Sequence, residues 1–113
     1  MSLKYYKKDK PITAQEGDFP APIVMTVPDI LPLTGFIVTF CIIDSSGRTF
    51  VKKKTTDYTI AVNGQIIQIY FNKEDTLGRA GTHKWELQLT TLGNEEEITI
   101  GGGPFTITPT FIK

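Results

Sequence analysis

The sequence predicts an all-β domain, and three observations indicate this class. Apolar and polar residues alternate through positions 81–90, an Asn-Gly dipeptide at positions 63–64 separates two apolar runs, and turn-forming residues recur along the chain. Alternation is typical of a strand with one buried face, because successive side chains of a strand point to opposite sides. Short strands separated by turns at intervals of roughly 8 to 12 residues favour two packed sheets.

The chain length and its first residues predict the domain organisation. The chain has 113 residues, the usual size of one compact domain. Residues 1–10 contain four lysines without a helical or strand period, so residues 1–11 are expected to form a flexible N-terminal arm. Residues 12–113 are then expected to fold as a single sandwich domain.

Charge balance and hydropathy argue against two classes of partner. Twelve Lys and Arg residues balance twelve Asp and Glu residues, so the surface has no net positive field to attract nucleic acid. No segment approaches the roughly 20 apolar residues that a membrane crossing needs, and the first residues lack the apolar run of a signal peptide. The sequence therefore predicts neither a nucleic-acid partner nor a membrane partner.

Prolines and apolar runs predict the first two strands. Prolines at positions 20, 22, 28 and 32 flank residues 23–27, and because proline cannot donate to a sheet, this segment is expected to be an edge strand. Residues 36–43 are apolar on both faces, so this strand is expected in the middle of a sheet. Its expected core-facing residues are Phe36, Val38, Phe40 and Ile42.

A turn and a returning strand are expected next. Residues 44–47, Asp-Ser-Ser-Gly, have the residue types of a tight turn. Residues 48–54 then return as a strand. The three lysines at positions 52–54 resemble the charged protection of exposed strand edges, so we expect their side chains to be solvated.

The Asn63-Gly64 dipeptide predicts a β-hairpin with a two-residue type I′ turn. Such a turn pairs Val62 with Gln65 and Ile60 with Ile67. Counting outward, it also pairs Tyr58 with Ile69 and Thr56 with Phe71. This register places the apolar residues of both strands on one side.

The last strands complete the predicted fold. Residues 72–80 show no alternation and have room for one short helical turn, and residues 81–90 then place His83, Trp85, Leu87 and Leu89 on one face. Residues 97–100 and 105–107 are strand-like, and the glycines at 101–103 between them indicate a bulge or a change of sheet. The whole pattern predicts an immunoglobulin-like Greek-key β-sandwich of about seven antiparallel strands.

The rare side chains do not form a recognisable catalytic or metal-binding pattern. Cys41, the single cysteine, lies in an apolar strand and is interpreted as a small buried thiol, and His83, the single histidine, as a structural residue at the rim of the core. Zinc requires clustered Cys and His, and no loop has an EF-hand spacing. We therefore expect no enzyme activity, no metal and no cofactor. A Cys-His pair in three dimensions and paired carboxylates stay open.

The remaining aromatic residues are candidates for a partner surface. Alternation assigns Phe36, Phe40, Trp85 and Phe105 to the core. The tyrosines Tyr5, Tyr6 and Tyr70 are not assigned in this way. Together with Ile23 and Val27 of the edge strand, they form the predicted interaction surface, because an unpaired edge can add to a neighbour's sheet.

Several short motifs occur in the order found in one protein family. They are QEGDF at 15–19, LTGFIV at 33–38, DSSG at 44–47, DTL at 75–77, GTHKWELQL at 81–89 and GPFTI at 103–107. Through them, residues 12–109 resemble the small immunoglobulin-like modules of phage tail and baseplate proteins, notably the N-terminal domain of the baseplate upper protein family. His83 departs from the tyrosine usual after Gly-Thr in such modules.

The resemblance implies a non-catalytic structural part of a phage or prophage tail or baseplate. Such a part works through protein-protein contacts with other tail subunits and as a homo-oligomer, in the virion or in the bacterial cytoplasm as a prophage product. A second hypothesis is a ligand-binding sandwich, carbohydrate-binding or adhesin-like, of a cell-surface protein. That hypothesis predicts exposed aromatic residues around a groove.

Overall fold

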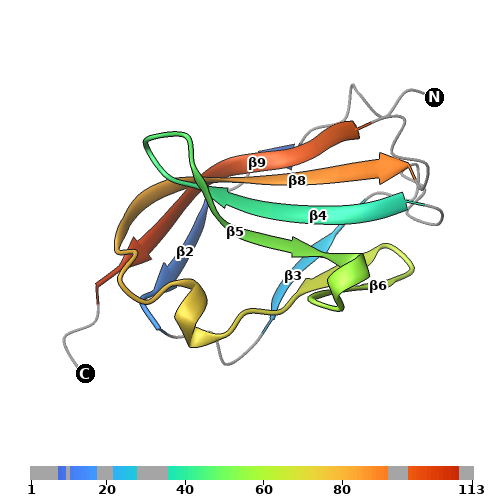
Figure 1. Ribbon diagram of the computed structural model, residues 1–113. Coiled ribbons are helices and arrows are strands. Elements are labelled where there is room, and N and C mark those ends of the chain that lie inside the picture. The colour runs from blue at the N-terminus through green and yellow to red at the C-terminus, as the bar shows by residue number, and fades with distance from the viewer. Residues whose placement is uncertain (1–7, 10, 18–21, 28–35, 92–96, 110–113) are drawn as a thin grey trace.

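The computed structural model describes residues 8–9, 11–17, 22–27, 36–91 and 97–109. Over these ranges the chain forms nine strands in two sheets that pack as a sandwich (Figure 1). The larger sheet has the order β1-β9-β8-β4-β5, with β2 also paired to β9, and the smaller sheet has the order β3-β7-β6. The strands are β1 (Lys8–Asp9), β2 (Ile12–Gln15), β3 (Ile23–Thr26), β4 (Phe36–Ile43), β5 (Thr49–Lys54), β6 (Ile60–Asn63), β7 (Ile66–Ile69), β8 (Gly81–Thr91) and β9 (Glu97–Thr108).

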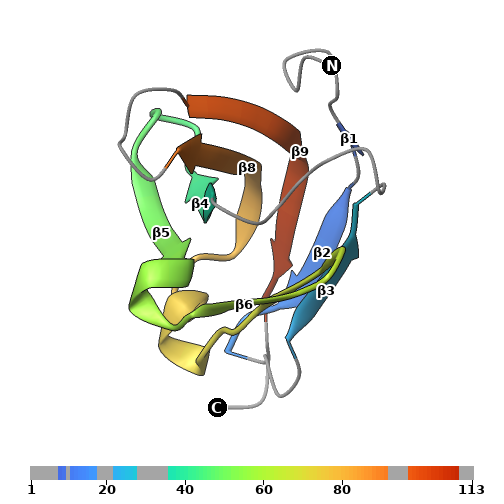
Figure 2. The same cartoon turned by 90° about the vertical axis from the view of Figure 1, so that its right-hand side faces the viewer.

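The predicted all-β sandwich is confirmed, and its strand order is immunoglobulin-like. The rows β9-β8-β4-β5 and β3-β7-β6 correspond to the G-F-C-C′ and B-E-D rows of that fold. The strand number is nine rather than about seven, and β1 and β2 pair with β9 in parallel rather than antiparallel. Figure 2 shows β2 lying beside the last part of β9. β1 falls within the predicted arm, whose residues 1–7 and 10 lie outside the described ranges.

The core lies between the two sheets and is built from alternate residues of their strands. Phe40 of β4 stacks on Trp85 of β8, with ring centroids 5.7 Å apart. Ile67 and Ile69 of β7 are fully buried on the opposite side. The predicted core residues Val38, Phe40, Ile42, Trp85, Leu87, Leu89 and Phe105 are confirmed, each at most 2% exposed, whereas Phe36 is half-buried and packs against them.

The predicted hairpin is present, but its turn begins one residue later. Asn63 pairs with Ile66, so the turn residues are Gly64 and Gln65. Only Gly64 of these two has a positive φ, at 62°, as in a type II′ turn rather than the predicted type I′. Ile60 consequently faces Ile69 instead of Ile67. Because pairing moves by two residues, the same side chains still face the core.

The strand predicted before Ile60 is interrupted by the short 3-10 helix η2 (Thr55–Asp57). Tyr58 closes this helix in the left-handed conformation, with φ 61°, and its side chain is 92% exposed. The predicted pairing of Tyr58 with Ile69 is therefore wrong. A second 3-10 helix, η3 (Lys73–Asp75), supplies the short helical turn predicted within residues 72–80.

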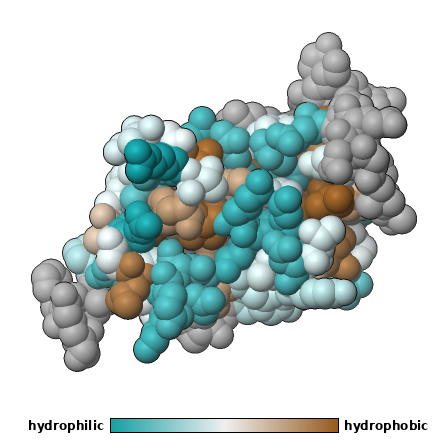
Figure 3. Space-filling model, viewed as in Figure 1, coloured by the Kyte–Doolittle hydropathy of each residue, from teal (hydrophilic) through white to brown (hydrophobic). Residues whose placement is uncertain are grey.

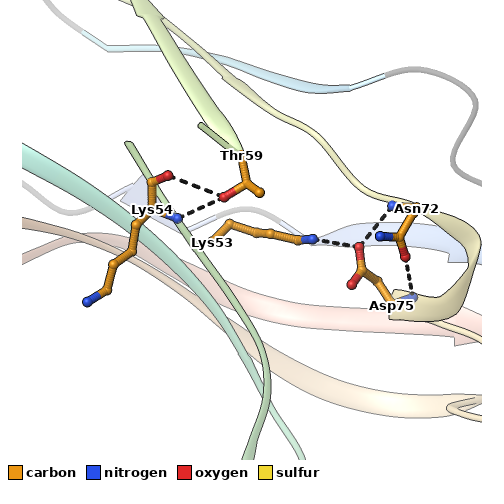
Figure 4. A network of polar contacts seen from close by, with 5 residues as sticks. All are labelled: Lys53, Lys54, Thr59, Asn72 and Asp75. Atoms are coloured by element: carbon orange, nitrogen blue, oxygen red, sulfur yellow. Dashed lines mark hydrogen bonds and ion pairs between the residues drawn. The ribbon is translucent and has the colours of Figure 1, made fainter. Parts of the chain in front are cut away.

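Lys53 corrects the prediction of three solvated lysines. Lys52 is exposed, but Lys53 is on the core side of β5 and only 7% exposed. Its ammonium lies 2.7 Å from a carboxylate oxygen of Asp75 in η3 (Figure 4). The same ammonium lies 5.4 Å from the ring centroid of Phe71. The Asp75 side chain also accepts a hydrogen bond from Asn72 N, and the Asn72 side chain accepts one from Asp75 N. Lys53 therefore forms its ion pair with a turn that is itself held by two hydrogen bonds.

The two features predicted at glycine-containing segments, a tight turn and a bulge, are present. In the turn after β4, Asp44 Oδ1 accepts hydrogen bonds from the hydroxyl of Ser46 and from the backbone of Ser46 and Arg48. The Ser46 hydroxyl is the main cause that lowers the pKa of Asp44. In β9, the register against β8 shifts just before Gly101: Leu87 pairs with Gly101, whereas Gln88 pairs with Thr99. This bulge lets one long strand replace the two strands expected there.

Candidate interaction surface

β3 presents a free backbone edge. It is the outer strand of the smaller sheet, and no described strand is hydrogen-bonded to its far side. Val27 N donates to Gln65 O at 2.9 Å, so the backbone groups of Val27 face β7. Backbone groups alternate in direction along a strand, so those of Met25 face β7 as well. The N–H and C=O groups of Val24 and Thr26 therefore point away from the sheet, where another strand can pair with them.

The smaller sheet has no ionisable side chain. The twelve residues of β3, β6 and β7 read Ile-Val-Met-Thr, Ile-Ala-Val-Asn and Ile-Ile-Gln-Ile. Its outward face carries Val24, which is 53% exposed, and Ile66, which is 41% exposed. The outward face of the larger sheet differs, since its strands carry Lys52 and Glu86 among other charges. The two faces of the sandwich are thus chemically distinct.

The predicted surface residues divide into three groups. Tyr70, 43% exposed, follows β7, and its hydroxyl donates to Gln68 Oε1 on the outward face at 3.1 Å. Ile23 is half-buried and packs against the core, and Val27 is buried at 5% exposure. Tyr5 and Tyr6 lie outside the described residues.

Val27 corrects the predicted surface, and Val24 and Ile66 were missed. Met25 and Val27 share one parity in the strand and turn inward, which leaves Val24 and Thr26 outward. The prolines around 23–27 indicated an edge but gave no parity, because four of these five residues are apolar. The sequence signal for this surface was the lack of charged residues in the three segments that form β3, β6 and β7.

Cys41 and His83 do not come together. Cys41 pairs with Glu86 and Ile42 with Trp85, so Cys41 is on the outward face of the larger sheet, whereas His83 shares the inward parity of Trp85. Cys41 is half-buried rather than buried, and burial is the main cause that raises the pKa of its thiol. The Cys-His pair left open by the sequence is therefore not formed.

His83 lies at the rim of the core. Its Nε2 lies 2.7 Å from the carbonyl oxygen of Arg79, which requires the hydrogen on Nε2. Its ring packs edge-on against the ring of Phe50, with centroids 4.8 Å apart. The Arg79 guanidinium lies over the Phe50 ring, 4.8 Å from its centroid. The Nδ1 atom is buried and has no hydrogen-bond partner among the described residues. The predicted place at the rim is confirmed, but one ring nitrogen is left unsatisfied.

The described residues contain neither a cluster of metal-binding side chains nor a membrane-spanning helix. No group of three or more His, Cys, Asp or Glu residues in this part of the chain is arranged to hold a metal ion. Within the same part, no helix is long and apolar enough to cross a membrane.

Comparisons with known proteins include a distant match to a solved structure. No family model matches the chain, and no curated protein matches it. Among solved structures, the crystal structure of CopC from Methylosinus trichosporium OB3b matches with 13% sequence identity and a TM-score of 0.47. The match covers 92% of this chain and 85% of that chain. Similarity at this level carries no argument about function.

Proposed function

We propose that this domain is a non-catalytic assembly module of a phage or prophage tail or baseplate. The ordered motifs of the sequence support the assignment to a phage tail. The observation that carries the assembly role is the free edge of β3 on a sheet without charged residues. Natural strand edges are usually protected by charge, as at β5, where Lys52 is exposed. The described residues of β3 carry no charge of this kind.

The proposed occupant of this edge is β3 of a second copy of the chain. A two-fold contact brings the same strand of both copies together antiparallel, and this strand offers no like charges to repel each other. The outward N–H and C=O groups of Val24 and Thr26 supply the hydrogen bonds. The exposed side chains of Val24 and Ile66 supply apolar area beside them.

The experiment is size exclusion with light scattering over a range of protein concentrations. The wild-type chain should form dimers or larger assemblies. Thr26→Pro removes an edge-facing N–H without removing a β3–β7 hydrogen bond, so it should shift the protein to monomer. Val62→Pro is the matched control. Tyr70 N donates to Thr59 O, so the backbone groups of Thr59 face β7. By alternation, the N–H of Val62 faces away from β7, at the opposite edge of the same sheet. A wild-type monomer at high concentration, encoded away from virion genes, would count against the proposal.

A ligand-binding sandwich is the second candidate, and Tyr70 is the observation that favours it. An exposed aromatic ring beside the amide of Gln68 combines an apolar face with polar groups, as sugar-binding surfaces require. Glycan-array binding that is lost in Tyr70→Ala, Tyr5→Ala or Tyr6→Ala would support this candidate. An empty array together with self-association through β3 would reject it.

A further inference from the structure

The outward face of the larger sheet contains a small polar pocket of about 110 Å³. It lies on the opposite side of the sandwich from the proposed assembly surface. Figure 3 shows hydrophilic side chains gathered over β5, which forms one wall. The pocket is lined by Ile37, Thr39, Lys52, Lys54, Thr56, Gln88, Thr90 and Glu97.

Strand pairing explains why these side chains converge. Val38 and Phe40 turn to the core, so Ile37 and Thr39 of β4 form the floor on the outward side. Thr39 is paired with Lys54 of β5 on one side and with Gln88 of β8 on the other. In the next row, Ile37 is paired with Thr90, which is paired in turn with Glu97 of β9. The pocket therefore spans four adjacent strands.

The polar side chains that line the pocket make no hydrogen bond or ion pair with other side chains in the part of the chain that the structure describes. Thr39 is only 5% exposed, and its hydroxyl makes no hydrogen bond within the described part of the chain. A hydroxyl that opens into the pocket and has no such partner can donate to or accept from a bound molecule. The ammonium groups of Lys52 and Lys54 also form no ion pair there, in contrast to Lys53 with Asp75.

The charges of the pocket are separated by strand. Lys52 and Lys54 come from β5, whereas Glu97 comes from β9, which is three strand spacings, or about 14 Å of backbone, away. The floor between these walls is uncharged. A purely anionic ligand would meet Glu97, and a purely cationic one would meet the lysines, so a ligand with opposite charges at its two ends fits this distribution.

We propose that this pocket binds a small zwitterion of the amino-carboxylate class. The carboxylate faces Lys52 and Lys54, the ammonium group faces Glu97, and the Thr39 hydroxyl and Gln88 amide bond the ligand from the floor. The volume has room for a small molecule but not for a folded partner. The two sources of this chemistry are a free metabolite and a segment of another protein that brings both charges.

Chemical-shift titration of the ¹⁵N-labelled full chain tests the pocket with three probes that each have four carbons. The probes are 4-aminobutyrate, butyrate and butylammonium. The zwitterion should give saturable shifts at Gln88 and Thr39, while the two singly charged probes bind more weakly. Lys54→Gln and Glu97→Gln should each raise the Kd for 4-aminobutyrate about two- to fivefold. Thr39→Val, which removes the hydroxyl, should also raise it.

Lys84→Gln is the matched control. Lys84 is on the same outward face but pairs with Glu86 at 3.4 Å and does not line the pocket, so its loss should leave the Kd unchanged. Equal binding of butyrate and 4-aminobutyrate, unaffected by Glu97→Gln, would overturn the zwitterion assignment. If none of the three probes saturates in the millimolar range, the ligand is not a free metabolite of this class. If a peptide with Lys and Asp at its ends also fails to bind, the pocket is not a binding site for a zwitterion.

Discussion

Single residues show how this fold places charge. Lys53 and Asp75 form a largely buried ion pair between β5 and the turn that precedes β8, and their side chains are 9% and 18% exposed. A lysine beside two others in sequence was expected in solvent. The signal against that expectation was parity, because Lys53 is in phase with the buried Val51. A run of like residues conceals such alternation.

Asp75→Ala tests the importance of this pair. The change leaves the Lys53 ammonium buried without its carboxylate and removes the hydrogen bond from the Asn72 backbone to the Asp75 side chain, so we expect a loss of about 2–4 kcal/mol in the free energy of unfolding. Urea denaturation measures it. Glu74→Ala, at an exposed neighbour in the same turn, is the control and should change stability by less than about 0.5 kcal/mol. Equal effects of the two changes would show that the pair is not important for stability.

At the level of elements, the sequence predicted strands well and their pairing less well. The two faces of β4 and β8 followed from alternation, since one face is buried and the other is not. The hairpin register did not follow, because a shift of two residues keeps every side chain on the same face. Parallel pairing of β1 and β2 with β9 joins opposite ends of the chain, and no local pattern reports it.

Trp85 and Lys84 test the two faces of β8. Trp85 is 1% exposed and stacks on Phe40, so Trp85→Ala should cost about 3–5 kcal/mol of stability. Lys84→Ala, on the outward face one residue away, should cost less than about 0.5 kcal/mol. Chemical denaturation of both variants gives the comparison. A loss below about 1 kcal/mol for Trp85→Ala would place the ring outside the core.

Gly64 tests the hairpin turn. A Cβ added at this residue meets no atom within 4 Å, so the cost of Gly64→Val comes from its φ of +62° and not from a clash. We expect a loss of about 1–2 kcal/mol and a lower melting temperature. Gln65→Val, at the neighbouring turn position without a positive φ, is the control and should lower the melting temperature less. An unchanged melting temperature in Gly64→Val would contradict this turn.

The whole molecule presents two unlike faces. One sheet is free of ionisable residues and ends in the open edge of β3, while the other carries lysines and glutamates around a polar pocket. The edge could be predicted from sequence because prolines flank it. The pocket could not, since its residues come from four strands and only their pairing brings them together. This division supports the proposal that the molecule assembles through the smaller sheet and keeps the pocket on the larger sheet accessible.

Amide hydrogen exchange of β3 as a function of protein concentration tests assembly through this edge most directly. In a monomer the N–H groups of Val24 and Thr26 point to solvent and should exchange fast, whereas that of Met25 is bonded to β7. Self-association through β3 predicts that exchange at Val24 and Thr26 slows as concentration rises, while exchange at Val62 on the opposite edge does not change. Rates at Val24 and Thr26 that are fast and equal at every concentration would contradict it.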